Sequence, residues 1–130
     1  MKIKKYSNEL YPYGVWVADD IDINSLTDMF TFLCNDDTEI SEEDAKKMLE
    51  DDGAYATTYK VTYKKDNSAG SLVVIYRDID IDTIAHEAGH VTQDVVEFLG
   101  FDFVSKGANE HIMYLLGWIA GRINNFIKSK

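Results

Sequence analysis

The chain has one cysteine, one proline and no long apolar run. Because Cys34 is the only cysteine, an intrachain disulfide is excluded. The longest apolar run, residues 112–121, holds 10 residues, whereas a helix that spans a bilayer needs roughly 20. The basic N-terminal residues are followed by polar ones, which argues against a secretory signal. We therefore expect a cytoplasmic protein.

Basic residues are also scarce. Lysine and arginine number 13 against 23 aspartates and glutamates, which gives a net charge of −10. Nucleic acids and anionic membranes are bound by clusters of lysine and arginine, so neither is an expected partner. The acidic runs, such as Glu50-Asp51-Asp52, are typical of solvated helix ends and loops.

The length and composition of the chain are typical of one folded domain. The 130 residues are 45% hydrophobic and 12% aromatic, enough for a sizeable core and too much for a disordered chain. Cys34 follows the apolar stretch 29–33, and we expect it to be a small buried residue rather than a nucleophile.

Hydrophobic periodicity and turn residues predict eight elements in the order β-β-α-α-β-β-α-α. Ser41 is expected to cap the second helix and Gly53 to end it, and Asp80 or Asp82 to cap the third helix. We expect an α+β fold with a small antiparallel or mixed sheet packed on two C-terminal helices, in a single domain 1–130. The expected strands cover residues 2–6, 13–18, 54–64 and 71–77, and the expected helices cover 24–34, 41–50, 82–99 and 107–127.

The pattern H-E-x-x-H occurs once, at His86-Glu87-Ala88-Gly89-His90, inside the third expected helix. Histidines four residues apart lie on one face of a helix, where both imidazoles can bind one Zn²⁺. Glu87 is adjacent in sequence and can reach a water at an open metal position, where a carboxylate acts as general base. The motif predicts a catalytic zinc site.

A catalytic zinc site needs a third protein ligand. We choose Glu110, which lies 20 positions after His90 in the first turn of the last expected helix. An antiparallel helical hairpin would bring that turn near the histidines, and a helix start favours a carboxylate.

His86, Glu87 and His90, followed by Gly107-Ala108-Asn109-Glu110, resemble the gluzincins, the thermolysin-like zinc peptidases. The last 60 or so residues are also similar to minimal gluzincins and to short H-E-x-x-H proteins of bacteriophages. For a phage-encoded protein, the cytoplasm would be that of the host. The resemblance implies Zn²⁺ bound by His86, His90 and Glu110, and hydrolysis of a peptide bond by zinc-activated water with Glu87 as general base. It also implies that an edge strand, here expected at 71–77, binds the substrate backbone.

Other third ligands are open. Asp94 continues the histidine face by one turn and is expected to accept a hydrogen bond from a ligand histidine rather than to bind metal. His111 points about 100° away from Glu110 around the helix and suits a surface role better. A metzincin is excluded, because Gln93 and Val96 stand where that family has glycine and histidine.

Tyr114 stands one turn after Glu110, on the same face of the expected helix. Its hydroxyl could donate to the oxyanion of a peptide hydrolysis reaction, although packing between helices is the commoner use of such an aromatic residue. Gly117 and Gly121, together with Gly89, are expected to let the two helices pack closely.

Two further classes compete with the zinc metallopeptidase. One is a catalytically inactive zincin-like binding or accessory protein that keeps a structural metal. The other is a small α+β interaction protein without metal, in which the motif is coincidence.

Overall fold

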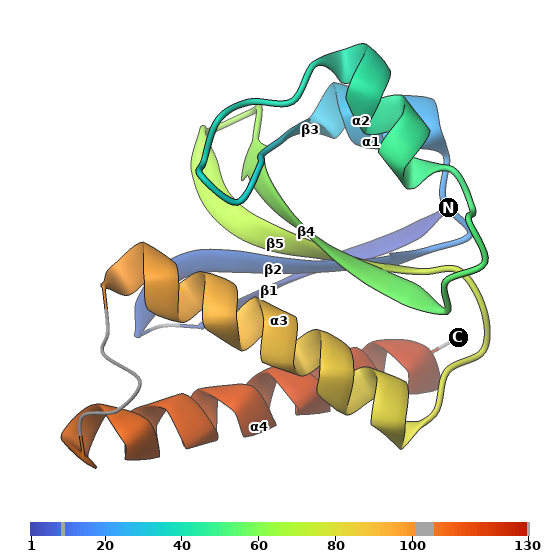
Figure 1. Ribbon diagram of the computed structural model, residues 1–130. Coiled ribbons are helices and arrows are strands. Elements are labelled where there is room, and N and C mark those ends of the chain that lie inside the picture. The colour runs from blue at the N-terminus through green and yellow to red at the C-terminus, as the bar shows by residue number, and fades with distance from the viewer. Residues whose placement is uncertain (9, 101–105, 130) are drawn as a thin grey trace. The chain divides into compact units, whose positions relative to one another are not determined.

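The computed structural model describes residues 1–8, 10–100 and 106–129 (Figure 1). The fold is α+β, as predicted. The chain forms two compact units, residues 1–78 and 79–130, and each is described by itself. The elements are β1 (Lys2–Asn8), β2 (Tyr11–Asp19), α1 (Ile23–Met29), β3 (Phe30–Phe32), α2 (Glu42–Leu49), β4 (Ala56–Tyr63), β5 (Ser68–Ile75), α3 (Ile81–Leu99) and α4 (Lys106–Lys128).

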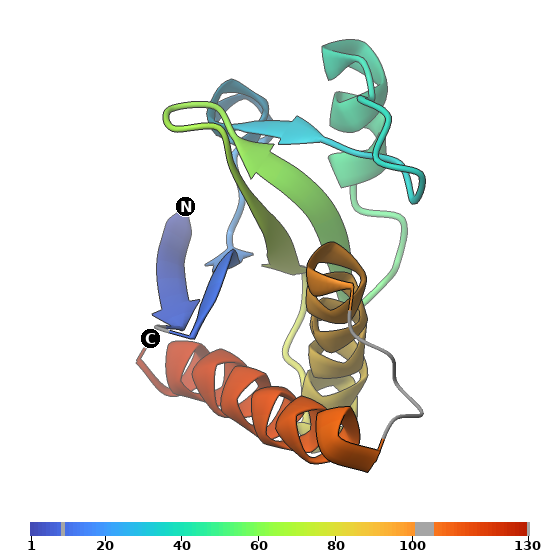
Figure 2. The same cartoon turned by 90° about the vertical axis from the view of Figure 1, so that its left-hand side faces the viewer.

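The first unit is built on a five-stranded mixed sheet with strand order β1-β2-β5-β4-β3, which can be followed in Figure 2. Three neighbouring pairs are antiparallel, and β2 pairs with β5 in parallel. The expectation that the strand at 71–77 is an edge strand is wrong. Ser71 to Ile75 pair with β2 on one side and with β4 on the other, so this strand has no open edge for a peptide.

The central strand β5 and its parallel neighbour β2 are buried on both faces of the sheet. Residues 13–18 of β2 and 70–75 of β5 are all buried, as expected for apolar runs at the centre of a covered sheet. On one face, Leu26 of α1 and Ala45 and Leu49 of α2 join the core of the unit. Figure 1 shows both helices on the same side of the sheet.

An aromatic cluster is the centre of this core. The ring of Trp16 lies 5.1 Å from that of Phe30, edge to face, and 5.6 Å from that of Tyr63. Gly14 and Gly70 are paired neighbours under this indole, and a Cβ at either position would collide with the Trp16 ring. Both glycines are therefore required by the close approach of the indole to the sheet.

The predicted helix at 24–34 is wrong in its second half. The helix ends at Met29, and Phe30 to Phe32 form β3, which pairs with β4. The residues Phe-Thr-Phe are strong β-formers, and both phenylalanines are buried on one face of the strand. Pairing with β4 outweighs the helical spacing of the apolar residues.

Cys34 is exposed rather than buried, which corrects the expectation from its apolar neighbours. It begins a tight turn after β3, in which its carbonyl accepts the N–H of Asp37 and its own N–H donates to the carbonyl of Thr38. The side chain therefore leaves the alternation that buries Phe30 and Phe32.

Ser41 caps α2 as predicted, because its hydroxyl accepts the backbone N–H of Asp44 at 3.1 Å. Gly53 does not end this helix, which stops at Leu49. Gly53 instead has a φ of +99° inside the loop that leads to β4.

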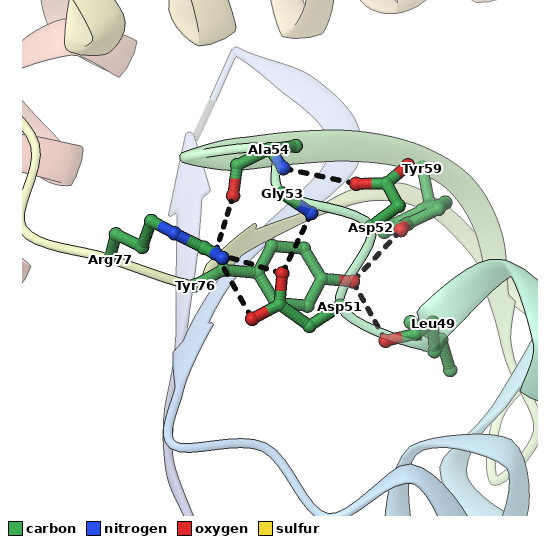
Figure 3. A network of polar contacts seen from close by, with 8 residues as sticks. All are labelled: Leu49, Asp51, Asp52, Gly53, Ala54, Tyr59, Tyr76 and Arg77. Atoms are coloured by element: carbon green, nitrogen blue, oxygen red, sulfur yellow. Dashed lines mark hydrogen bonds and ion pairs between the residues drawn. The ribbon is translucent and has the colours of Figure 1, made fainter.

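Hydrogen bonds and an ion pair join this loop to residues 76 and 77, which directly follow β5 (Figure 3). Nη1 of Arg77 donates to the two carboxylate oxygens of Asp51 at 2.8 and 3.0 Å, and to the carbonyl of Ala54 at 3.1 Å. The Tyr76 hydroxyl donates to the carbonyl of Leu49 at 3.0 Å. Burial and a hydrogen bond with Tyr59 raise the pKa of Tyr76, so this donor remains protonated at any physiological pH.

The second unit is a helical hairpin in which α4 runs back along α3 (Figure 1). The bounds 81–99 and 106–128 agree with the predicted helices. Residues 101–105, between the two helices, lie outside the described residues. None of the helices in the described part of the chain is long and apolar enough to cross a membrane.

Candidate metal centre

The candidate site is carried by α3, whose ends are set by local sequence. Asp80 is the N-cap, and its carboxylate accepts the backbone N–H of Thr83 at 3.2 Å. Gly100 ends the helix in the left-handed region, with a φ of 72°, where glycine is free of the strain that a side chain brings. The 19 residues between these caps hold the whole H-E-x-x-H motif in regular helix.

The two faces of α3 differ sharply. A buried stripe follows helical spacing, and a second face, which carries both histidines of the motif, is exposed. The buried stripe consists of Ile84, Glu87, Ala88, Val91, Thr92, Val95 and Val96. The histidines are therefore accessible to a ligand from solvent.

His86 and His90 form a preorganised pair of imidazoles. Their Nε2 atoms lie 3.1 Å apart, and their rings are 4.7 Å apart at an angle of 80°. Two nitrogens that bind one tetrahedral zinc ion at about 2.0–2.1 Å are separated by about 3.3 Å. The observed separation is that of a hydrogen bond between the two rings, and it is a few tenths of an ångström shorter than the separation that zinc requires.

Glu87 is 3% exposed, which is unusual for a carboxylate. It has an interaction partner within the protein. It is about 60° around the helix from His90, at the border between the exposed histidine face and the buried stripe. The side chain is thus withdrawn from bulk water, whereas the two histidines are exposed.

Glu110, the predicted third ligand, is exposed in the first turns of α4. No group of three metal-ligating side chains forms among the described residues, so the structure does not bring Glu110 together with His86 and His90. Counted from the connected ends of the helices, Glu110 is about 6 Å along α4 and His90 is about 14 Å along α3. An offset along the hairpin axis accounts for the separation. The side chain of Asn109 lies outside the described residues.

Tyr114 is 73% exposed, so the expectation that it packs between helices is wrong. Its hydroxyl is available to a ligand. His111 is exposed, in line with a surface role, and Asp94 is half-buried and has an interaction partner.

Close helix packing does not explain the glycines. A Cβ added at Gly89, Gly117 or Gly121 would meet no described atom within 4 Å. These positions face open space, which corrects the expectation that they allow the helices to approach each other.

The contact between Trp118 and Arg122 in α4 was not predicted from the sequence. The guanidinium carbon of Arg122 lies 5.5 Å from the centre of the Trp118 ring. The signal was available, because an aromatic residue and an arginine four positions apart share one face of a helix.

Comparison of the chain with models of protein families, with curated proteins and with solved structures found no match.

Proposed function

We propose that this chain is a small zinc-dependent metallopeptidase of gluzincin type. The observation that carries the proposal is the separation of 3.1 Å between Nε2 of His86 and Nε2 of His90 on an exposed helix face. Imidazole nitrogen is a preferred ligand of zinc, and the spacing of four residues places both imidazoles on one face of the helix.

His86, His90 and Glu110 would hold the metal. Zinc in such a site supplies a Lewis acid that polarises a carbonyl and activates water. Because Glu110 is exposed and offset along the hairpin, zinc binding requires the first turns of α4 to rearrange toward His90. A carboxylate, two imidazoles and an open position match the donor set of catalytic zinc sites.

Glu87 would be the general base. Its carboxylate accepts a proton from the attacking water and returns it to the leaving amine. Tyr114, exposed on α4, would donate a hydrogen bond to the carbonyl oxygen as negative charge develops.

The test is the cleavage of fluorescently labelled casein by protein loaded with one equivalent of Zn²⁺. We expect cleavage that EDTA abolishes. Glu87→Gln should retain zinc and lose at least about 100-fold in rate, the usual contribution of a general base. Equal cleavage by Glu87→Gln and the unmodified chain would exclude this mechanism.

A second candidate is a zincin-like binding protein with a structural metal and no hydrolytic activity. It is favoured by one observation, the position of Glu87 in the same buried stripe as Ile84 and Val91. A carboxylate with a purely structural role there would make Glu87→Gln less stable. The second candidate therefore predicts zinc binding without casein cleavage, and a lowered unfolding temperature for Glu87→Gln.

A further inference from the structure

The two edges of the five-stranded sheet differ in length and in what lies beside them. At one edge, β3 has only three residues, and the carbonyl of Phe32 accepts the N–H of Ile40, so the chain itself folds back along part of this edge. At the other edge, β1 has seven residues and is about 24 Å long. Figure 2 shows β1, in dark blue, as the last strand of the sheet beside β2. No strand among the described residues pairs with the outer side of β1.

The outer side of β1 has the regular backbone that a further strand requires. Lys2 to Ser7 pair with Asp19 to Gly14 of β2 without interruption, and the one shift in register lies between Ser7 and Asn8. In an antiparallel pair, alternate residues direct their N–H and C=O groups away from the partner strand. Proline and bulges prevent pairing at many sheet edges, but β1 has no proline and is irregular only at its last residue. An extended peptide can therefore add to the sheet at this strand.

Lysines make this edge basic. Residues 1–8 hold three lysines and no acidic residue, in a chain whose net charge is −10. Lys4 and Lys5 are exposed, and neither forms an ion pair with a described residue. Their ammonium groups lie over aromatic rings, with Nζ of Lys4 5.1 Å from the centre of the Tyr6 ring and Nζ of Lys5 5.1 Å from that of Trp16. Because successive residues of a strand point to opposite faces, β1 has positive charge on both faces of the sheet.

This charge disfavours one occupant of the edge and favours another. Two copies of β1 paired edge to edge would bring lysines of one strand beside lysines of the other, and like charges across strands destabilise pairing. Glutamates at alternate positions of an added strand would share one face of the sheet, as Lys2 and Lys4 do, and opposite charges across strands stabilise pairing. The edge therefore suits an acidic peptide better than a second copy of this chain.

We propose that β1 binds an extended acidic segment of a partner protein by strand addition. Backbone hydrogen bonds along the outer side of β1 supply the affinity, and the lysines select acidic side chains. The binding strand belongs to the first unit, and binding requires neither zinc nor hydrolysis. The inference therefore goes beyond the proposed function and stands independently of it.

The experiment is a titration of ¹⁵N-labelled, metal-free protein with four short capped peptides, followed by NMR at the backbone amides of β1. The first peptide has glutamate at every second position between threonines, and the second and third have glutamine and lysine in place of the glutamates. The fourth is the N-methylated form of the glutamate peptide, which keeps the charge but cannot donate backbone hydrogen bonds. We expect the glutamate peptide to shift the amides of β1 and to bind at least about tenfold more tightly than each of the others.

Each other outcome contradicts a part of the proposal. Equal binding of the glutamate and glutamine peptides would exclude selection by the lysines, and equal binding of the N-methylated peptide would exclude strand addition. No shift in β1 with any peptide would overturn the proposal as a whole. A dimer that forms through β1 without peptide, detected by sedimentation, would make a second copy of the chain the occupant and would also overturn it.

Two variants of equal net charge give an independent check. Lys4→Glu reverses one charge on β1 and should weaken binding of the glutamate peptide at least about tenfold. Lys47→Glu is the matched control, because Lys47 is exposed on α2, which contacts β3 at the opposite edge of the sheet. Its affinity should stay within about twofold of that of the unmodified chain. Equal losses in the two variants, both shown to be folded by circular dichroism, would reduce the effect to net charge and contradict the assignment to β1. Since no zinc or hydrolysis enters these measurements, their outcome is separate from that of the zinc proposal.

Discussion

The imidazoles of His86 and His90 face each other across one turn of α3, with their Nε2 atoms 3.1 Å apart. Because residues four apart lie on one face of a helix, the two imidazoles need little rearrangement to bind one metal ion, whereas Glu110 must move toward them. The pair is exposed, so a zinc ion can reach it directly from solvent.

Zinc binding should therefore depend on both histidines of the pair. We expect His86→Ala and His90→Ala each to weaken zinc binding at least about 100-fold, because one imidazole cannot chelate. His111→Ala removes the third histidine of the chain and serves as the matched control, with affinity unchanged. Calorimetric titration with ZnCl₂ and metal analysis of the purified variants measure both effects. Undiminished zinc content in His86→Ala would rule out the pair as the site.

The third ligand can be assigned by ranking two carboxylates. Glu110→Ala should weaken zinc binding at least about tenfold more than Asp94→Ala does. Removal of a metal ligand costs more affinity than removal of a side chain that only orients a ligand histidine, which weakens metal binding roughly 10–100-fold. Zinc should also change the surroundings of Trp118 on α4, visible in its fluorescence, if Glu110 moves toward the histidines. The opposite ranking of the two variants would make Asp94 the ligand.

Alanine substitutions of the glycines should change the free energy of unfolding in opposite directions in α4 and in the sheet. Gly117→Ala and Gly121→Ala should each stabilise the fold by about 0.5–1 kcal/mol, because alanine favours helix and the added methyl group meets open space. Gly70→Ala should destabilise it by about 1–3 kcal/mol, because its Cβ would collide with the Trp16 ring. Urea unfolding measures all three, and a stable Gly70→Ala protein would contradict the packing of the indole on the sheet.

The contact between Arg77 and Asp51 makes stability depend on pH in the acid range. The hydrogen bond from Arg77, together with the N–H of Gly53, lowers the pKa of the Asp51 carboxyl below its ordinary value of 3.8. A lowered pKa in the folded state contributes stability above the unfolded-state value and loses it as the pH falls through the folded-state value. We expect the unfolding temperature to fall below about pH 3.8, and less steeply in Asp51→Asn. Equal slopes in the unmodified chain and in Asp51→Asn would exclude a contribution from this ion pair.

Local sequence predicted the parts of the fold that local forces determine. Asp80 and Ser41 cap their helices as expected, and residues 56–63 of the strand predicted at 54–64 form β4. The errors lie where distant pairing decides. Phe30 to Phe32 became a strand because β4 is beside them, and the central position of β5 follows from a parallel partner that no local pattern reveals.

In the candidate site, too, the relation set by local spacing was predicted and the relation set by long-range packing was not. The relation of His86 to His90 follows from spacing within one helix, and the structure has it as predicted. The position of Glu110 depends on the register of two helices across the connection between residues 99 and 106, which spacing does not define. The contact between Arg122 and Trp118 was not predicted, although a spacing of four residues on one helix face is typical of such a pair.

The parallel pairing of β2 with β5 has a consequence for how the chain reaches its fold. Gly14 pairs with Gly70, so the centre of the sheet joins residues that are 56 positions apart in sequence. Contacts of such separation form slowly, whereas helical hairpins such as α3–α4 form from near neighbours. During synthesis the β1–β2 hairpin must wait for β5 before its buried faces are covered. The helix that carries the histidines begins at Ile81, only six residues after β5 ends, and it can be complete soon after the sheet closes.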